Sequence, residues 1–576
     1  MQLYQTLLKH WTQLYPEGDP GLLRDFADEV EEARRQMIHM REQQKEWYKD
    51  AIIYSVYVDL FNRDFSGLTG KLDYLQDLGV NCLWLLPVLD SPMKDAGFDI
   101  RNYDRIRLEL LGLPQHSTLE EQRALFRDFL AEAHKRGLKV IFDIAINHTS
   151  DEHPWFIESR RSEQNAYRDY YIWSKTTDRY KEARIIFEGL CESNWEKDGE
   201  WYFFHRFFEF QPDLNYRNPE VLFEMSRNFL FWLSQGVDGF RADAIPYLWK
   251  EEGTACENHP LTHTVVKFFR AVIDHVRPGT LLLAEACQRP NEVVRYFGDG
   301  DECNAGYHFP LMPQIFKTLA SGDKFPVQHI LSPQVTPAIP DSAQWFTFMR
   351  CHDELSLELV YVSEEDRKYI HDNYCLQPEW DFRLGQGVSA RLAELLKRDP
   401  LKIGLAFSVM LSLPGTPIVY YGDEFGKLND EAYYREMIKL SGKDDTRFLV
   451  RGKIDWEQTE KELQDVFSFS YMVFSRVKNL LNTRKNYRCF GRGSIEWLDV
   501  KTTDAEQAGQ VLSYIRAYEG EQVLIVQNLK NETVSIQIPH PGEKGLDLLG
   551  QPIQQGEGTG QIVLNPYDYL WIDLKS

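Results

Sequence analysis

The sequence has few cysteines and no long uninterrupted apolar run. Only 8 of its 576 residues are cysteine. They form no CxxC pair and no zinc-like spacing, so we expect buried free thiols. No run approaches the ~18 apolar residues of a membrane span, and the first 19 residues lack the apolar core of a signal peptide. We therefore predict a cytoplasmic protein that does not enter a membrane.

Basic residues are also in short supply. The chain carries 65 Lys and Arg against 88 Asp and Glu, a formal net charge of -23. Nucleic acids and anionic membrane surfaces bind basic faces, so both partner classes are excluded. With 43% hydrophobic and 13% aromatic residues the chain can fill large cores, and its length predicts roughly two to four domains. These features favour a soluble protein that handles a small neutral substrate.

Residues 49–460 repeat one pattern, in which an apolar run is followed by a polar loop and an amphipathic helix. Seven of the apolar runs are strand candidates, at residues 52–61, 81–88, 139–146, 239–244, 280–285, 345–350 and 417–421. Repeated strand-helix units predict a parallel sheet, and their number matches a (β/α)8 TIM barrel of the α/β class.

The remaining segments extend this barrel. Residues 149–215 follow the third strand, are too long for a simple connection, and predict a small inserted domain. A second excursion covers residues 354–399. Residues 1–48 predict a short N-terminal helical extension. Residues 461–576 predict a closing helix and then a C-terminal antiparallel β-sandwich, because short alternating strands are separated by turns.

Polar side chains gather where the predicted strands end. Arg241 and Asp243 are two residues apart on a strand and share a face. The cation is expected to lower the pKa of Asp243 and keep it available as a nucleophile, although an ordinary buried pair is the alternative. Because the carboxyl ends of barrel strands converge, six further residues are candidates for the same site. They are Asp143, Asn147, His148, Glu285, His352 and Asp353.

Five short segments carry a resemblance to a known family. They read DIAINH at 143–148, QPDLN at 211–215, GFRAD at 239–243, AEA at 284–286 and RCHD at 350–353. In this order they resemble the α-amylase family (glycoside hydrolase family 13), which comprises retaining glycoside hydrolases and transglycosylases. The resemblance covers residues 50–460, and the C-terminal sandwich also fits.

The resemblance implies a role for each residue. Asp243 would be the nucleophile of a β-glycosyl-enzyme and Glu285 the acid/base, with their carboxyls about 5 to 5.5 Å apart. Asp353 would stabilise the oxocarbenium-like transition state. The apolar run 281–283 and Asp353 are expected to raise the pKa of Glu285. The residues implied or expected to orient the nucleophile or bind substrate are Arg241, Asp143, His148 and His352.

A further match concerns the floor of the pocket. Gly97-Phe98-Asp99 resembles the family's Gly-Tyr-Asp block, in which the ring stacks on the sugar. In relatives that act on a terminal glucose this aspartate pairs with an arginine, and Arg451, five residues before Trp456, is the candidate partner. An Asp99/Arg451 floor predicts a blind pocket for one glucosyl unit and small α-glucosides such as maltose, trehalose or sucrose as substrates.

No cofactor is implied. In many relatives Asn147 and Asp213 would bind a structural calcium, but the resemblance to α-glucosidase-type members implies that the ammonium of Lys250 takes the cation position. The family's other calcium loop is replaced by residues 62–67, which lack enough oxygen ligands. We therefore expect no required metal.

Two subgroups of the family are resembled. Segments between residues 241 and 358 are similar to trehalose synthases, whereas 249–250, 422–430 and 445–456 are more similar to amylosucrases and sucrose hydrolases. The leading hypothesis is isomerisation of maltose and trehalose by intramolecular glucosyl transfer. The alternatives are an exo-acting α-glucosidase or α-amylase-type hydrolase, an amylosucrase-like enzyme, and an inactive binding module. The presence of Asp243, Glu285 and Asp353 argues against the last.

Overall fold

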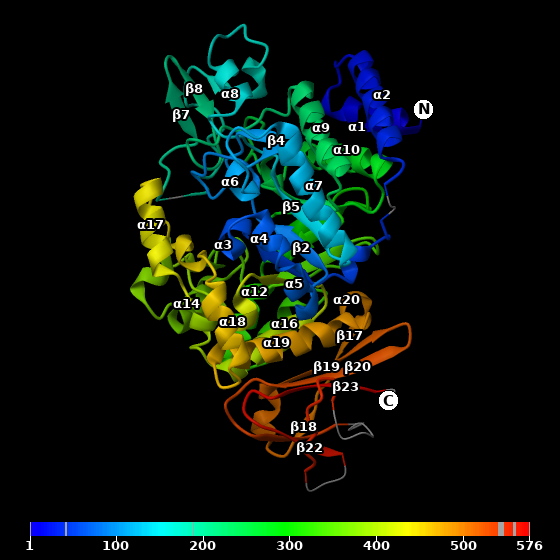
Figure 1. The fold of residues 1–576 in the computed structure, drawn as a ribbon, viewed down its shortest axis with the longest axis vertical. Helices are drawn as coiled ribbons and strands as arrows, with labels where there is room; N and C mark the ends of the chain where they lie inside the picture. The colour runs from blue at the N-terminus through cyan, green and yellow to red at the C-terminus, as the bar shows by residue number, and fades with distance from the viewer. Residues whose placement is uncertain (1, 41–42, 188, 539–546, 557–559, 575–576) are drawn as a thin grey trace.

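Eight parallel strands close into a barrel in the centre of the chain (Figure 1). The computed structural model describes residues 2–40, 43–187, 189–538, 547–556 and 560–574. Around the barrel the order is β1-β16-β12-β11-β10-β9-β5-β2. The strands are β1 (Ile53–Val56), β2 (Cys82–Leu85), β5 (Lys139–Ala145), β9 (Gly239–Asp243), β10 (Leu281–Ala284), β11 (Ala305–Tyr307), β12 (Gln344–Phe348) and β16 (Thr416–Tyr420). The predicted TIM barrel is confirmed.

Two differences from the predicted strands have local causes. The sixth barrel strand, β11, is only Ala305–Tyr307, which is too short to give a hydrophobic pattern. The first predicted strand, 52–61, is half helix, because β1 ends at Val56 and α3 (Val58–Asn62) follows. Both segments are apolar and buried, so burial alone does not separate strand from helix.

The helices around the barrel begin and end with recognisable caps. The principal ones are α5 (Leu72–Leu78), α7 (Leu119–Lys135), α9 (Pro219–Gln235), α10 (Pro260–Val276), α12 (Leu311–Ser321), α16 (Pro400–Ser412) and α19 (Phe469–Lys485). Thr118 and Glu121 form a capping box at the start of α7. The closing helix predicted at the start of residues 461–576 is in fact two helices, α18 (Trp456–Gln464) and α19, separated by residues 465–468.

The N-terminal helices α1 (Gln2–Leu14) and α2 (Pro20–Met37) pack on α9 and α10 (Figure 1). Trp11 and Phe26 stack on Phe223 of α9, with ring centroids 5.4 and 4.4 Å away. The Tyr15 hydroxyl donates to the Tyr216 carbonyl at 2.8 Å. Because these rings are buried, the extension is continuous with the core of the barrel domain.

Both excursions from the barrel carry small antiparallel sheets. The segment after β5 contains α8 (Pro154–Ser159) and the strands β6 (Trp173–Ser174), β7 (Trp195–Asp198) and β8 (Trp201–Phe204), in the order β6-β8-β7. The segment after β12 contains β13 (Leu355–Ser356), α14 (Glu364–Tyr374), β14 (Asp381–Phe382) and β15 (Gly387–Val388), in the order β13-β15-β14. Side chains from both segments line the pocket described below.

The C-terminal part forms two antiparallel sheets at the lower end of Figure 1, as predicted. One contains β17 (Ser494–Trp497), β19 (Val511–Tyr518), β20 (Glu521–Asn528) and β23 (Tyr569–Asp573). The other contains β18 (Lys501–Thr502), β21 (Val534–Gln537) and β22 (Gln561–Leu564). An apolar cluster that includes Val526, Ile536 and Ile562 fills the space between them.

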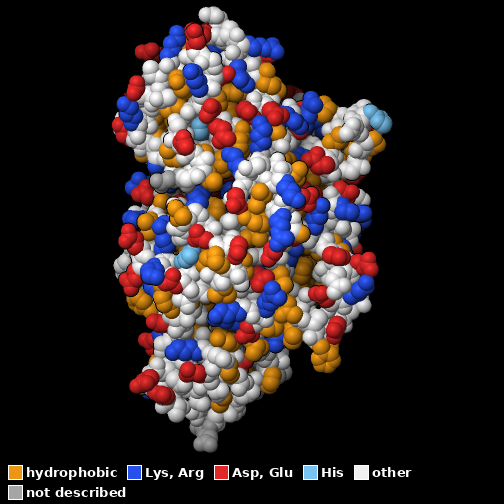
Figure 2. Space-filling view, turned by 90° about the vertical axis from the view of Figure 1, so that its left-hand side faces the viewer, with side chains coloured by type: hydrophobic (Ala, Val, Ile, Leu, Met, Phe, Trp, Pro, Cys, Tyr) orange, Lys and Arg blue, Asp and Glu red, His pale blue; other side chains and the backbone are white. Residues whose placement is uncertain are grey.

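The surface carries both positively and negatively charged side chains. Figure 2 shows Lys and Arg side chains intermixed with Asp and Glu over the face in view. Within the described part of the chain, no helix has the length and apolar character required to cross a membrane.

Candidate active site

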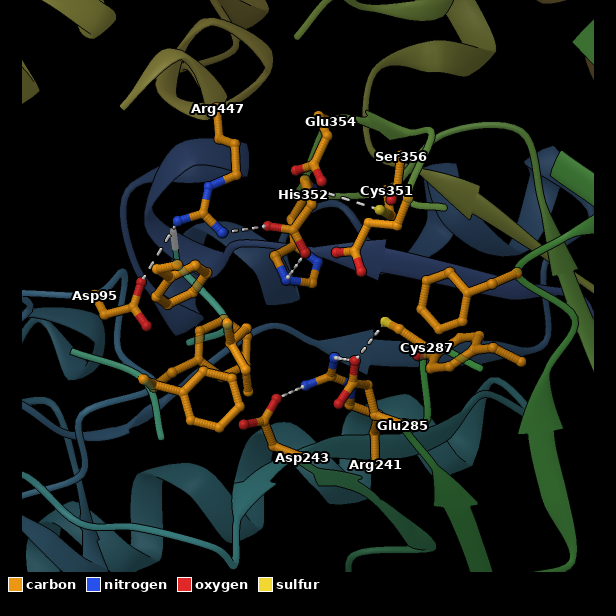
Figure 3. A pocket seen from close by; sticks show the side chains of 18 of the residues that line it. Asp95, Arg241, Asp243, Glu285, Cys287, Cys351, His352, Glu354, Ser356 and Arg447 are labelled. Atoms are coloured by element: carbon orange, nitrogen blue, oxygen red, sulfur yellow. Dashed lines mark hydrogen bonds and ion pairs between the residues drawn. The ribbon is translucent and has the colours of Figure 1, made fainter. Parts of the chain in front are cut away.

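Arg241 lies at the centre of a group of carboxylates at the carboxyl end of the barrel (Figure 3). Its Nη1 is 2.8 Å from Asp143 Oδ1 and 2.5 Å from Asp243 Oδ1, and its Nη2 is 3.9 Å from Glu285 Oε1. In the barrel register Arg241 on β9 is the direct neighbour of Asp143 on β5. One buried guanidinium therefore contacts three carboxylates that come from three consecutive strands.

The backbone of β9 and β10 approaches closely at the base of this group. A Cβ added at Gly239 would lie 2.5 Å from the Leu281 Cβ, so the start of β9 has no room for a side chain. After β9, Ala244 adopts φ 57°, in the left-handed region. Its N–H donates to Glu285 Oε2 at 2.9 Å. The turn after the strand thus fixes the carboxylate of Glu285 next to Asp243.

A thiol also contacts Glu285. Cys287 Sγ is 3.1 Å from Glu285 Oε1, and Cys287 lines the pocket (Figure 3). As the S–H is the donor and the carboxylate the acceptor, both oxygens of Glu285 have a protein donor. Sequence reasoning did not single out Cys287, because its role depends on a contact with a residue two positions earlier on an irregular turn.

Asp353 lies on the opposite side of the pocket, between two arginines. Arg447 Nη1 and Arg451 Nη2 are 3.2 and 3.1 Å from its Oδ1, and His352 Nε2 is 3.1 Å from its Oδ2. Burial favours the neutral acid, but His352 and the two arginines together hold the pKa of Asp353 well below its usual range. This carboxylate is negatively charged, as a group that stabilises a cationic transition state must be.

The pKa of Asp243 differs from our expectation. Burial and the neighbouring carboxylates of Glu285 and Asp143 raise the pKa of Asp243 to about 8, although Arg241 opposes them. Arg241 does lower this pKa, as expected, but burial and the carboxylates of Glu285 and Asp143 outweigh its effect, so the net shift is upward. Because neighbouring carboxylates titrate together, the raised proton affinity belongs to the cluster, and an acid/base pair needs one shared proton of this kind.

The two predicted histidines are buried and neutral. Burial lowers the pKa of His148 to about 4 and that of His352 to about 3. The ring of Phe98 stacks on His352 with centroids 5.4 Å apart. A neutral imidazole has one donor and one acceptor nitrogen, which suits it to sugar hydroxyls. His148, His352 and Phe98 all line the same pocket as Asp243.

The predicted Asp99/Arg451 pair is absent. Asp99 accepts hydrogen bonds from Ser91 Oγ and from the backbone N–H groups of Lys94 and Asp95, at 2.9 to 3.1 Å. It stabilises a turn and does not line the pocket. Arg451 instead contacts Asp353, as described above. The prediction was wrong because of the backbone geometry of this turn, which places the carboxylate of Asp95, and not that of Asp99, at the pocket.

Asp95 is the carboxylate that this turn presents (Figure 3). Gln211 Nε2 donates to its Oδ2 at 3.0 Å, and Arg447 Nη2 is 4.0 Å from its Oδ1. Asp95, Arg447 and Arg451 therefore form the charged end of the pocket that we had assigned to Asp99 and Arg451.

The pocket is small and covered by both excursions. Its volume is about 150 Å³, below the ~300–1,000 Å³ of sites for drug-sized ligands. Arg383, from the second excursion, donates from Nη1 to the Ile186 carbonyl of the first at 3.1 Å and lies over the Phe187 ring. This contact joins the two covers on one side of the pocket that contains Asp243 and Glu285.

Lys250 takes the position that the sequence predicted for it. Its Nζ lies 2.7 Å from Asn147 Oδ1 and 2.8 Å from Asp213 Oδ2, and the residue is only 3% exposed. The ammonium supplies a positive charge to a buried carboxylate at this point. The oxygen pair that a calcium ion would use therefore already has a cationic partner.

The comparison with family models matches most of the chain. The model described as alpha amylase, catalytic domain, matches residues 39–488. The model described as maltogenic amylase, C-terminal domain, matches residues 501–571. The second match covers the strands β18 to β22 and the start of β23, and it begins after β17.

Similar proteins include two named for trehalose synthesis. The trehalose synthase/amylase of Mycobacterium tuberculosis is 40% identical over 84% of this chain and 82% of that protein. The trehalose synthase of Pimelobacter sp. is 37% identical over 92% of this chain and 96% of that protein. Among solved structures, the α-amylase of H. orenii superposes with a TM-score of 0.69 at 24% identity, over 91% of this chain and 99% of that one. The last likeness concerns the fold alone.

Replacement of Lys250 tests the buried ion pair. Lys250→Met removes the ammonium and leaves Asp213 without its partner, so we expect a loss of stability of about 3–5 kcal/mol. The midpoint of urea unfolding measures it, with Lys197→Met on the exposed strand β7 as the matched control. Added calcium should leave the melting temperature of the unaltered protein unchanged; an increase would mean that calcium and not Lys250 is the cation.

The raised pKa of Asp243 gives a second prediction. Its folded value of about 8 lies above the ~4 of an unfolded aspartate. The stability it contributes is present below about pH 4 and is lost as the pH rises towards 8. The amide introduced by Asp243→Asn has no proton to lose, so this variant lacks the pH-dependent loss of stability. The melting temperature of the variant, relative to that of the parent, should therefore be higher at pH 8 than at pH 5. The exposed Asp128→Asn is the control, and a difference independent of pH would contradict the assignment.

Proposed function

The chain belongs to the α-amylase family of retaining glycosidases and transglucosylases, and from this premise we propose that it interconverts maltose and trehalose. The reaction is an intramolecular glucosyl transfer. Asp243 is the nucleophile, Glu285 the acid/base and Asp353 the stabilising carboxylate. The contact that joins the two excursions beside the pocket of these groups is the observation that supports this outcome most strongly.

In the first half-reaction the non-reducing glucosyl unit of maltose lies against Phe98 and the charged end formed by Asp95, Arg447 and Arg451. An Asp243 oxygen attacks the anomeric carbon while Glu285 donates its proton to the glycosidic oxygen. The glycosidic bond breaks, glucose is released within the pocket, and a β-glucosyl ester forms on Asp243. The negative Asp353 stabilises the positive charge that develops on the ring.

In the second half-reaction the released glucose turns and presents its anomeric hydroxyl. Glu285, now a carboxylate, takes the proton of that hydroxyl. The hydroxyl oxygen of the glucose then attacks the anomeric carbon of the ester. The bond to Asp243 breaks and an α,α-linked disaccharide is formed. No water is consumed, and the proton that Glu285 gave in the first step is recovered in the second.

Enclosure decides between transfer and hydrolysis. A hydrolase uses the same three carboxylates, but water takes the place of the returning glucose. The contact between Arg383 and Ile186 joins the two excursions that line the pocket, and in this proposal it keeps the released glucose close to the ester. Hydrolysis would then be a slow side reaction that depends on how completely the covers exclude water.

The relatives support the same choice. Two proteins that match most of this chain at 37% and 40% identity are named trehalose synthases, one of them also an amylase. An oligo-1,6-glucosidase of Bacillus cereus matches 92% of the chain at 26% identity. The identity to the trehalose synthases is higher than that to the glucosidase, and this favours the transfer reaction.

Product analysis tests the proposal. Maltose should give trehalose, and trehalose should give maltose, as the main products by NMR. Asp243→Ala should lower kcat/KM by about 10³-fold or more while the circular dichroism spectrum is unchanged. If maltose gives only glucose, the protein is an exo-hydrolase; release of fructose from sucrose in place of trehalose formation would indicate an amylosucrase-like enzyme.

The covers give a separate prediction. Arg383→Ala removes the hydrogen bond to the Ile186 carbonyl and admits water, so the ratio of glucose to trehalose formed from maltose should rise several-fold. The exposed Arg435→Ala, on α17 (Glu431–Ser441), should leave the ratio unchanged. An unchanged ratio in Arg383→Ala would mean that this contact does not control access of water.

A further inference from the structure

Three metal-ligating side chains meet on the second excursion, outside the pocket. His371 lies in the last turn of α14, Cys375 follows that helix, and Asp381 begins β14. One ligand atom from each of the three lies within 4.8 Å of the other two. None of them lines the pocket or has a part in the proposed reaction. We propose that they form a binding site for a divalent transition metal of the Zn²⁺ class.

The geometry suits such an ion. His371 and Cys375 are four residues apart, so their side chains leave the end of α14 on the same side. His371 Nε2 and Asp381 Oδ1 are already 2.7 Å apart. In a tetrahedral zinc site the ligand atoms are about 3.5 Å from one another, from bond lengths of ~2.0–2.3 Å. The three ligand atoms, all within 4.8 Å of one another, are already close to this spacing.

The donor set selects the metal. Thiolate, imidazole and carboxylate together are typical ligands of Zn²⁺, whereas Ca²⁺ and Mg²⁺ require oxygen ligands. All three residues are partly exposed, so water can complete the fourth position. On binding, the thiol of Cys375 loses its proton to solvent and the sulfur bonds to the metal.

A second group of this kind within the described ranges is less suited to a cation. It consists of Cys351, His352 and Asp353. There the carboxylate already contacts the guanidinium groups of Arg447 and Arg451 at 3.2 and 3.1 Å. Two fixed positive charges oppose a divalent ion at that point. Among the residues that the structure describes, Asp381 forms an ion pair with His371 and with no arginine or lysine.

One ligand of the proposed metal site, Asp381, lies in the same hairpin as Arg383. Asp381 Oδ1 also accepts the N–H of Gly385 at 2.9 Å, in the turn between β14 and β15. The same turn begins with Arg383, which contacts Ile186 above the pocket. A metal shared by α14 and Asp381 would therefore fasten the hairpin that carries Arg383. This inference stands apart from the choice between isomerase and hydrolase.

Titration of the tag-free, full-length protein with Zn²⁺ and Co²⁺ tests the site. We expect one ion per chain, a thiolate-to-cobalt charge-transfer band, and a higher melting temperature in Zn²⁺. His371→Ala and Cys375→Ser should each weaken binding by about 10-fold or more, in line with the sensitivity of metal sites to their ligands. Both variants should keep the circular dichroism spectrum of the parent.

Cys351→Ser is the matched control, because it removes the thiol of the other group. It should leave binding and the cobalt band unchanged. The proposal would be overturned if no ion bound at micromolar concentration, if the band were absent, or if Cys351→Ser removed it while Cys375→Ser did not. Hydrogen exchange provides a second measurement, in which Zn²⁺ should slow exchange of the Gly385 amide in the parent only.

Discussion

The structure depends on one buried guanidinium that is shared by three carboxylates. Arg241 holds Asp143 and Asp243 within 2.8 Å and contacts Glu285 more loosely. Such a cluster is costly to bury, and the pKa of Asp243 is raised as a result. The cost is tolerated because the barrel register fixes β5, β9 and β10 side by side. Destabilised carboxylates of this kind are what a nucleophile and an acid/base require.

The residues that line the rest of the pocket come from loops and from the two excursions. The turn held by Asp99 presents Asp95, and the segment 446–451 supplies Arg447 and Arg451. Together they close one end of the pocket. Arg383 joins the two covers at the other side. In the proposed mechanism the catalytic groups thus come from barrel strands or the residues just after them, whereas the groups that choose between water and sugar come from connecting segments.

Much of this could be predicted from the sequence, because period-two spacing and strand ends are local features. Arg241 and Asp243 share a face for that reason, and the short family blocks mark the other carboxylates. Asp95 could not be preferred to Asp99, since the choice depends on how one turn folds. β11 has only three residues and gives no pattern. The pKa of Asp243 depends on Asp143 and Glu285, which are distant in the sequence and become neighbours only in the barrel.

The central claim is that the glucose released from maltose is the molecule that attacks the glucosyl unit bound to Asp243. The most direct measurement is conversion of unlabelled maltose in the presence of excess ¹³C-labelled free glucose, followed by NMR of the trehalose formed. The account predicts trehalose without label, because the released glucose reacts before it leaves the pocket. Trehalose labelled in one of its two rings would contradict it, since the acceptor would then have come from solution.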